Sequence, residues 1–153
     1  MALAIGDTLP DGKLTLADGT PLSLRERLRR PLVVYFYPKA DTTGCTREAQ
    51  DFSALADDFE QSGADVFAIS RDTPAKLARF AEKHGLTVTL ASDGDGSVCE
   101  AFGVWGEKQM YGRTYMGIER ATFLFDANGR LIREWRKVKV AGHAADVLSA
   151  VQS

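Results

Sequence analysis

The sequence has only two cysteines, Cys45 and Cys99, and only two histidines among its 153 residues. Two thiols do not make the disulfide framework of a small secreted protein. The two cysteines are also far apart in the sequence, so together with two histidines they form no cluster of metal ligands, and we expect no metal site. Whatever chemistry the thiols perform must therefore depend on where each one lies in the fold.

The sequence also lacks an excess of charge of either sign. Its net charge is -2, so no global field draws it to nucleic acid or to an anionic membrane. We interpret the basic stretches at 25–30 and 133–139 as solvated surfaces. No apolar stretch approaches the length of a membrane span, and residues 1–7 lack the basic region and apolar core of a signal peptide. We therefore expect a cytoplasmic protein.

Internal repeats and low-complexity linkers are absent as well. A chain of this length can bury one substantial core, so we predict a single domain over residues 1–153. The proportions of hydrophobic residues, 44%, and charged residues, 26%, are those of an ordinary globular protein and exclude a disordered one.

Hydrophobic periodicity predicts strands that alternate with helices. Asp18 and Gly19 mark the turn of an N-terminal hairpin, and Ala127, Asn128 and Gly129 mark the turn of a late one. The predicted elements, in chain order, are strands at 13–16, 22–24 and 31–37, a helix at 45–60, a strand at 65–70, a helix at 74–84, a strand at 88–91, a short helix at 97–102, strands at 121–126 and 130–135, and a helix at 144–151.

This order predicts an α/β fold. Strands joined by helical crossovers pair in parallel, and the late hairpin adds antiparallel strands to the same sheet. The expected result is a central mixed sheet flanked by helices on both faces, with an N-terminal β-hairpin. Cys45 then follows the carboxyl end of a central strand, at the beginning of the next helix, which is the usual functional edge of such a sheet.

The predicted position of Cys45 favours a reactive thiol. Backbone N–H groups at a helix N-terminus are unpaired, and the helix dipole places partial positive charge there. Both favour the thiolate, which is the nucleophilic form. Thr42 precedes the cysteine by three residues across a turn that Pro38 stiffens, so its hydroxyl could meet the sulfur. Arg120 immediately precedes the strand at 121–126 and is a candidate cationic partner if that strand neighbours the central one.

Each candidate also has a purely structural interpretation. Cys45 could be a buried packing thiol, Thr42 a helix N-cap, and Arg120 a surface charge at a strand end. Glu48 lies one turn after Cys45, where a carboxylate alone would disfavour the thiolate. It could pair with an arginine such as Arg120 or be a solvated helix residue. For Cys99, packing in a short apolar helix is favoured over a role as a second reactive thiol.

Together these residues resemble the peroxiredoxin active-site pattern Pro38-x-x-x-Thr42-x-x-Cys45. The segments 33–39, 103–108 and 117–120 are similar to the bacterioferritin comigratory protein subgroup, also called PrxQ. The resemblance implies a thioredoxin-like fold and thiol-dependent reduction of hydroperoxides without a cofactor. It also implies that Cys45 is the peroxidatic cysteine, that Thr42 and Arg120 activate it, and that Pro38 shields its pocket.

The sequence departs from the subgroup at two places. Thr43 stands where the subgroup usually has a proline. Many members carry a second, resolving cysteine five residues after the first, where this chain has Gln50, and others carry it in the next helix, near Ala81. The usual internal disulfide is therefore excluded, and Cys99 is the one possible resolving thiol.

We therefore predict a peroxidase of hydrogen peroxide and organic hydroperoxides that serves antioxidant defence and redox homeostasis. Its Cys45 sulfenic acid is expected to be recycled by an external thiol: thioredoxin, glutaredoxin or a small thiol. We expect a monomer. A thioredoxin-type oxidoreductase would need a Cys-x-x-Cys pair, and the segment 42–45 has only the last cysteine. The alternative from another class is a non-enzymatic redox sensor or holdase that is switched by oxidation of Cys45.

Overall fold

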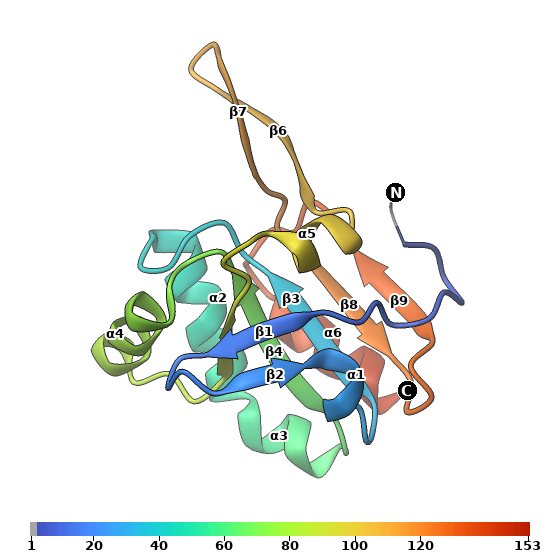
Figure 1. Ribbon diagram of the computed structural model, residues 1–153. Helices are drawn as coiled ribbons and strands as arrows, with labels where there is room; N and C mark the ends of the chain where they lie inside the picture. The colour runs from blue at the N-terminus through green and yellow to red at the C-terminus, as the bar shows by residue number, and fades with distance from the viewer. Residues whose placement is uncertain (1–2) are drawn as a thin grey trace.

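Residues 3–153 are described by a computed structural model, shown in Figure 1. Residues 1 and 2 belong to the segment considered above for a signal peptide and lie outside the described part. No helix within residues 3–153 has the length and apolar character needed to cross a membrane.

Seven strands form one mixed sheet. Leu32 to Phe36 in β3 is buried at every residue, which explains its near-continuous apolar sequence. In spatial order across the sheet the strands are β2 (Pro21–Ser23), β1 (Lys13–Leu16), β5 (Thr89–Ser92), β4 (Asp65–Ser70), β3 (Leu32–Phe36), β8 (Ala121–Phe125) and β9 (Leu131–Trp135).

The pairing directions agree with the sequence prediction. β3 pairs with β4 and β4 with β5 in parallel, joined by helical crossovers, while β8 lies antiparallel to β3 and β9 antiparallel to β8. The β1–β2 hairpin joins the sheet through β5. The predicted neighbourhood of the strand at 121–126 and the first central strand is thus confirmed, and Ala121 pairs with Phe36 at the end of β3.

Helices cover both faces of the sheet, so there are two cores. Alternate residues of β3 point to opposite sides, with Val34 in one core and Tyr35 in the other. The Tyr35 side is covered by α2 (Thr43–Ala54), α3 (Ala56–Gln61), α4 (Pro74–His84) and α6 (His143–Gln152). The Val34 side is covered by the short helices α1 (Leu24–Arg27) and α5 (Ser97–Ala101).

The predicted helix at 45–60 is wrong in two details. It begins at Thr43, and it is interrupted at Leu55, where ψ is 8° instead of the helical value and the chain turns into α3. Phe52 before the break and Phe59 after it both remain buried and stack on each other. The apolar stripe that predicted one helix is therefore shared by two helices that both pack on the sheet.

The sequence prediction also missed a long hairpin. β6 (Trp105–Met110) and β7 (Arg113–Ile118) form a separate two-stranded sheet that projects from the body, at the top of Figure 1. Most of its residues are exposed, and Tyr111 at the turn is 96% exposed. Such a ribbon has no buried face, so its sequence lacks the apolar alternation by which strands are recognised.

Candidate active site

Cys45 lies where the polypeptide leaves the central strand and enters α2. It is the third residue of the helix, and its side chain is 2% exposed. The helical hydrogen bonds begin with the Thr46 N–H, which donates to the Thr42 carbonyl at 2.8 Å. The N–H of Cys45 precedes this bond and so has no acceptor in the preceding turn. The helix therefore presents a donor and the positive end of its dipole beside the sulfur.

Arg120 joins the cysteine to a buried carboxylate. Its Nη2 donates to the Cys45 sulfur at 3.4 Å, and its Nη1 donates to Glu48 Oε1 at 2.7 Å. The pairing of β8 with β3 explains the contact, because it places Arg120, the residue before β8, at the edge of the sheet where α2 begins. Of the two alternatives left open for Glu48, an arginine partner or a solvated position, the structure has the arginine partner.

The surroundings of Glu48 and Arg120 change the pKa values of both side chains. Glu48 is 1% exposed, and desolvation raises the pKa of its carboxyl to about 7, against the opposing effect of Arg120. Its second oxygen, Oε2, receives no hydrogen bond from the described residues. Burial alone would lower the pKa of the Arg120 guanidinium. Glu48 and Cys45 beside it have the larger combined effect, so the pKa is raised. The arginine therefore remains a cation between two acidic groups.

Gly44 allows the guanidinium to come this close. A Cβ at position 44 would lie 3.3 Å from Arg120 Nη2, which is closer than ordinary packing permits. A Cβ at this position would therefore require the guanidinium to shift by a few tenths of an ångström, since the backbone at Gly44 is regular helix.

Thr42 and Pro38 contribute to the site in a different way from Arg120. The Thr42 hydroxyl donates to the Lys39 carbonyl at 2.8 Å, so it stabilises the turn before α2. The expected hydroxyl–sulfur hydrogen bond is not found within residues 3–153. Pro38 and Thr42 line one wall of an open cleft of about 620 Å³, whose opposite wall is the β6–β7 hairpin.

Lys108 on β6 is a residue of the site that the sequence reasoning missed. Its Nζ donates to the Ile118 carbonyl at 2.8 Å, and its stem crosses Gly117, where a Cβ would lie 2.9 Å from Lys108 Cδ. Burial, together with the charge of Arg120, lowers the pKa of Lys108, while Cys45 acts in the opposite direction. The hairpin thus brings a second cation into the neighbourhood of the cysteine. No sequence signal pointed to Lys108, because neither strand of the hairpin was predicted.

Cys99 is on the other side of the sheet. Cys45 packs in the core on the Tyr35 side, whereas Cys99 is fully buried in the core on the Val34 side. Both thiols are free. The backbone N–H of Cys99 donates to Asp93 Oδ2 at 2.7 Å, and burial together with that carboxylate raises the pKa of the thiol well above its usual range. Cys99 is therefore held as a neutral, packed side chain.

The described residues contain no group of three or more His, Cys, Asp or Glu side chains that could hold a metal ion. The two histidines are engaged elsewhere. His84 pairs with Asp41, and His143 is buried with its Nε2 at 2.7 Å from the Thr122 hydroxyl. The arrangement at Cys45 is thus that of a sheltered nucleophile with a helix N-terminus and cations around it.

Comparison with known proteins places this site in a familiar context. The sequence profile of the AhpC/TSA family matches residues 5–134. Peroxiredoxin Bcp of Xanthomonas campestris pv. campestris is 47% identical over 143 residues, which cover 94% of this chain and 89% of that protein.

Solved structures agree with the sequence comparison. PrxQ of Xylella fastidiosa superposes with a TM-score of 0.93 at 40% identity, covering 99% of this chain and 97% of that one. The bacterioferritin comigratory protein of Xanthomonas campestris superposes with a TM-score of 0.88 at 44% identity, covering 95% and 98%. That protein was crystallised in trapped intermediate and ligand complexes to explain its alkyl peroxide reduction activity.

Proposed function

Since this chain belongs to the AhpC/TSA family and is a peroxiredoxin, a thiol-dependent peroxidase with a thioredoxin-like fold, we propose that Cys45 is the residue that reduces the peroxide. The observation that carries the proposal is the Arg120 guanidinium, which contacts the Cys45 sulfur and the buried Glu48 carboxylate at the same time. An arginine held in this way stabilises negative charge on the sulfur and is in position for the oxygen that the reaction makes anionic.

In the proposed reaction the Cys45 thiolate attacks the distal oxygen of the hydroperoxide in line with the O–O bond. The S–O bond forms as the O–O bond breaks, so the sulfur is oxidised and the peroxide is reduced. Negative charge moves onto the leaving oxygen, which Arg120 and the Cys45 N–H stabilise and which takes a proton to become water or an alcohol. The sulfur is left as a sulfenic acid.

The other named residues have supporting roles in this proposal. Glu48 fixes the orientation of Arg120 through the 2.7 Å hydrogen bond. Thr42 holds the turn before α2 through Lys39, and its oxygen can still accept a hydrogen bond from a bound peroxide. Pro38 forms part of the wall that limits access of water to the thiolate.

Recycling by an external thiol is the second part of the proposal. Cys45 and Cys99 belong to cores on opposite faces of the sheet, so a bond between them would require the sheet to open. The reductant is therefore thioredoxin, glutaredoxin or a small thiol. Two free cysteines suit a reducing compartment, and we place the protein in the cytoplasm on that ground.

The test is chemical identification of the oxidised residue. After one equivalent of hydrogen peroxide, mass spectrometry should find one added oxygen atom on the Cys45 peptide and none on the Cys99 peptide. The Cys45→Ser variant should consume no peroxide, because a serine hydroxyl is a far weaker nucleophile at neutral pH. Peroxide turnover by folded Cys45→Ser would refute the assignment. A protein that reacts once and does not turn over with any supplied thiol would instead favour the redox-sensor alternative.

A further inference from the structure

The oxidised cysteine of the proposed cycle must be reached from outside, and the following inference rests on that proposed function. With Cys45 2% exposed, an external thiol needs an opening next to this residue. Cys45 does not itself line the cleft between residues 38–42 and the β6–β7 hairpin. Two of its neighbours do: Thr42 is the N-cap of the helix that carries Cys45, and the charge of Lys108 interacts with Cys45. The volume of this cleft, about 620 Å³, is that of a small-molecule site.

The charge of this cleft is opposite to that of the chain. Three cations line it, Lys39, Arg71 and Lys108, whereas the whole chain has a net charge of -2. The one carboxylate on its wall is Asp72. That carboxylate is already engaged, because Asp72 Oδ2 accepts hydrogen bonds from the Ala40 N–H at 2.8 Å and from the Ser70 hydroxyl at 2.7 Å. With three cations and one carboxylate on its wall, the cleft has a net positive lining that favours an anionic ligand.

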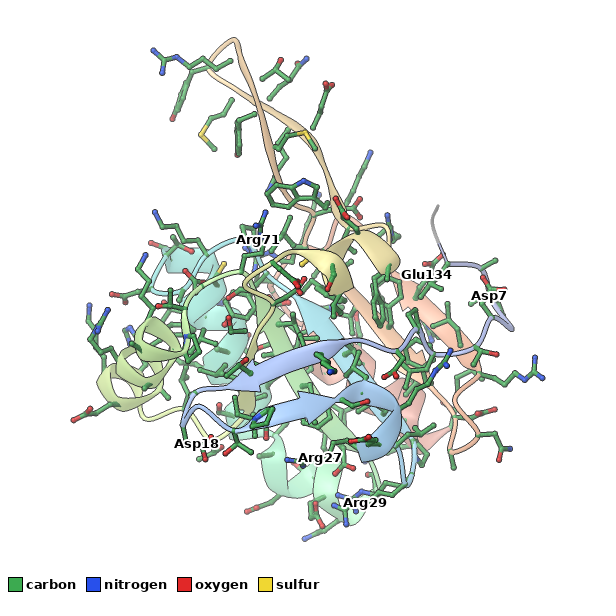
Figure 2. All side chains as sticks on the ribbon, in the orientation of Figure 1. Asp7, Asp18, Arg27, Arg29, Arg71 and Glu134 are labelled. Carbon is green, nitrogen blue, oxygen red and sulfur yellow. The ribbon has the colours of Figure 1, made fainter. Side chains whose placement is uncertain are left out.

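Arg71 is held in place for such a ligand. Its guanidinium lies 4.6 Å from the centre of the Trp105 ring, and its Nη2 donates to the Gly94 carbonyl at 3.3 Å. Figure 2 shows the labelled Arg71 beneath the foot of the projecting hairpin. Neither contact neutralises the arginine, so its charge remains available to the cleft. An arginine fixed on an aromatic ring also loses less entropy on binding a carboxylate than a free one.

We infer that this cleft binds a small thiol carrying a carboxylate group, and that such a thiol is the reductant of Cys45. Lys39, Arg71 and Lys108 bind the carboxylate, while the sulfur of the ligand approaches Cys45 past Thr42. In the first step the ligand sulfur attacks the sulfenic acid, forming an S–S bond and releasing water. In the second step another molecule of the same thiol attacks the ligand sulfur of this mixed disulfide. The thiolate of Cys45 leaves, and a symmetric disulfide of the reductant is released.

The experiment isolates the re-reduction step. The protein is first oxidised with one equivalent of hydrogen peroxide, and formation of the Cys45 sulfenic acid is verified by mass. It is then mixed with mercaptoacetate, mercaptoethanol or cysteamine, which carry a negative, a neutral and a positive group. Each rate is divided by the thiolate concentration and then by the rate of the same thiolate with a small disulfide in solution, so that neither the ionised fraction nor the intrinsic nucleophilicity of the thiol enters the comparison. We expect mercaptoacetate to react about tenfold faster than cysteamine, with a ratio that falls as salt is added.

The test variant is Lys39→Gln with Lys108→Gln, which removes two positive charges. The control is Lys13→Gln with Arg27→Gln, which removes two positive charges from exposed positions on β1 and α1, away from the cleft. In the test variant, the ratio of the mercaptoacetate rate to the cysteamine rate should fall below about threefold. In the control, this ratio should equal that of wild type. Equal rates for the three thiols in the wild type, or the same ratio in the test variant, would overturn the inference.

A parallel experiment tests whether the carboxylate that the cleft binds belongs to the thiol or to the hydroperoxide. The reduced proteins are mixed with a carboxylated and with an uncharged hydroperoxide, and the first oxidation is followed. If the test variant loses a preference for the carboxylated peroxide while its preference among thiols is unchanged, the cleft serves the peroxide and the inference is wrong. Absence of sulfenic acid at the outset would refute the proposed function itself, which is a separate result.

Discussion

Arg120 hydrogen bonds with one terminal nitrogen to the sulfur of Cys45 and with the other to the carboxylate of Glu48. The fork of the guanidinium is what permits this, since a lysine offers a single point of charge. The two acidic partners lie one turn apart on α2, and the arginine reaches them from the position just before β8, the strand that pairs with β3. The site is thus assembled across the sheet edge from distant parts of the sequence.

The first prediction is that Arg120→Lys slows oxidation of Cys45 about 100-fold, the usual cost of losing one donor to a developing oxyanion. The second-order rate of reaction with hydrogen peroxide, measured by rapid mixing, checks it. Arg113→Lys on the exposed part of β7 is the control and should react at the wild-type rate. A rate within about threefold of wild type in folded Arg120→Lys would show that a single positive charge suffices.

The second prediction concerns the pH dependence of stability through Glu48. Burial raises the pKa of this carboxyl from 4.5 to about 7, so the folded state binds a proton more tightly than the unfolded state does. Between these two values the folded protein carries more protons, and its stability falls as the pH rises. The Glu48→Gln variant removes this titration. The free energy of unfolding of Glu48→Gln minus that of wild type should therefore increase from about pH 4.5 to about pH 8, by at most about 3 kcal/mol.

Urea unfolding of both proteins at the two pH values measures this difference. His143 also titrates in this range, since burial lowers its pKa to about 4, and it stabilises the fold increasingly as the pH rises from that value toward 6.5. Because His143 is present in both proteins, its contribution cancels in the comparison. A difference between wild type and variant that does not change with pH would mean that folding does not raise the pKa of the Glu48 carboxyl.

The third prediction concerns Gly44. In Gly44→Ala the new methyl group would lie 3.3 Å from Arg120 Nη2 and should push the guanidinium away from the sulfur. Alanine favours the helix more than glycine does, so the variant should be at least as stable as wild type and yet oxidise about tenfold more slowly. Gly106→Ala, where a Cβ meets no atom within 4 Å, is the control. Unchanged reactivity in Gly44→Ala would show that Arg120 can move without loss.

The fourth prediction concerns Cys99. Because this thiol lies in the core opposite Cys45, Cys99→Ala should keep most of the steady-state turnover when an external thiol is supplied. Turnover of hydrogen peroxide with excess thiol is the measurement. Cys99→Val serves as a second variant that fills more of the same volume, so a loss through packing alone would differ between the two. Fast first oxidation with abolished turnover in both would identify Cys99 as the resolving thiol.

Much of this architecture could be predicted because buried strands and helices leave a periodic pattern. The parallel pairing and the position of Cys45 after β3 follow from the alternation of buried strands with helices. For Glu48 the sequence left two alternatives, an arginine partner such as Arg120 or a solvated position, and the structure shows the pair with Arg120. The break at Leu55 could not be predicted, because the stripe of apolar residues continues across it. Conformation at that residue is decided by how two helices fit the sheet.

The hairpin and its contribution to the site could not be predicted for a different reason. β6 and β7 have mixed polar and apolar residues on both sides, so nothing in their sequence indicates a face. Lys108 therefore appeared as an ordinary surface charge. The hydroxyl of Thr42 was expected at the sulfur, but the Lys39 carbonyl competes for the same proton, and that competition is visible only in three dimensions.

The placement of the two thiols on opposite faces of the sheet has a consequence for the cell. An enzyme that can close an internal disulfide stores each oxidising event in its own structure until a reductase arrives. Here the sheet keeps the two thiols apart, so in the proposed cycle each molecule of peroxide removed draws at once on thiols in the surroundings. In that cycle the rate follows the supply of reduced thiol, and oxidant arriving faster than that supply converts the Cys45 sulfenic acid irreversibly to higher oxides.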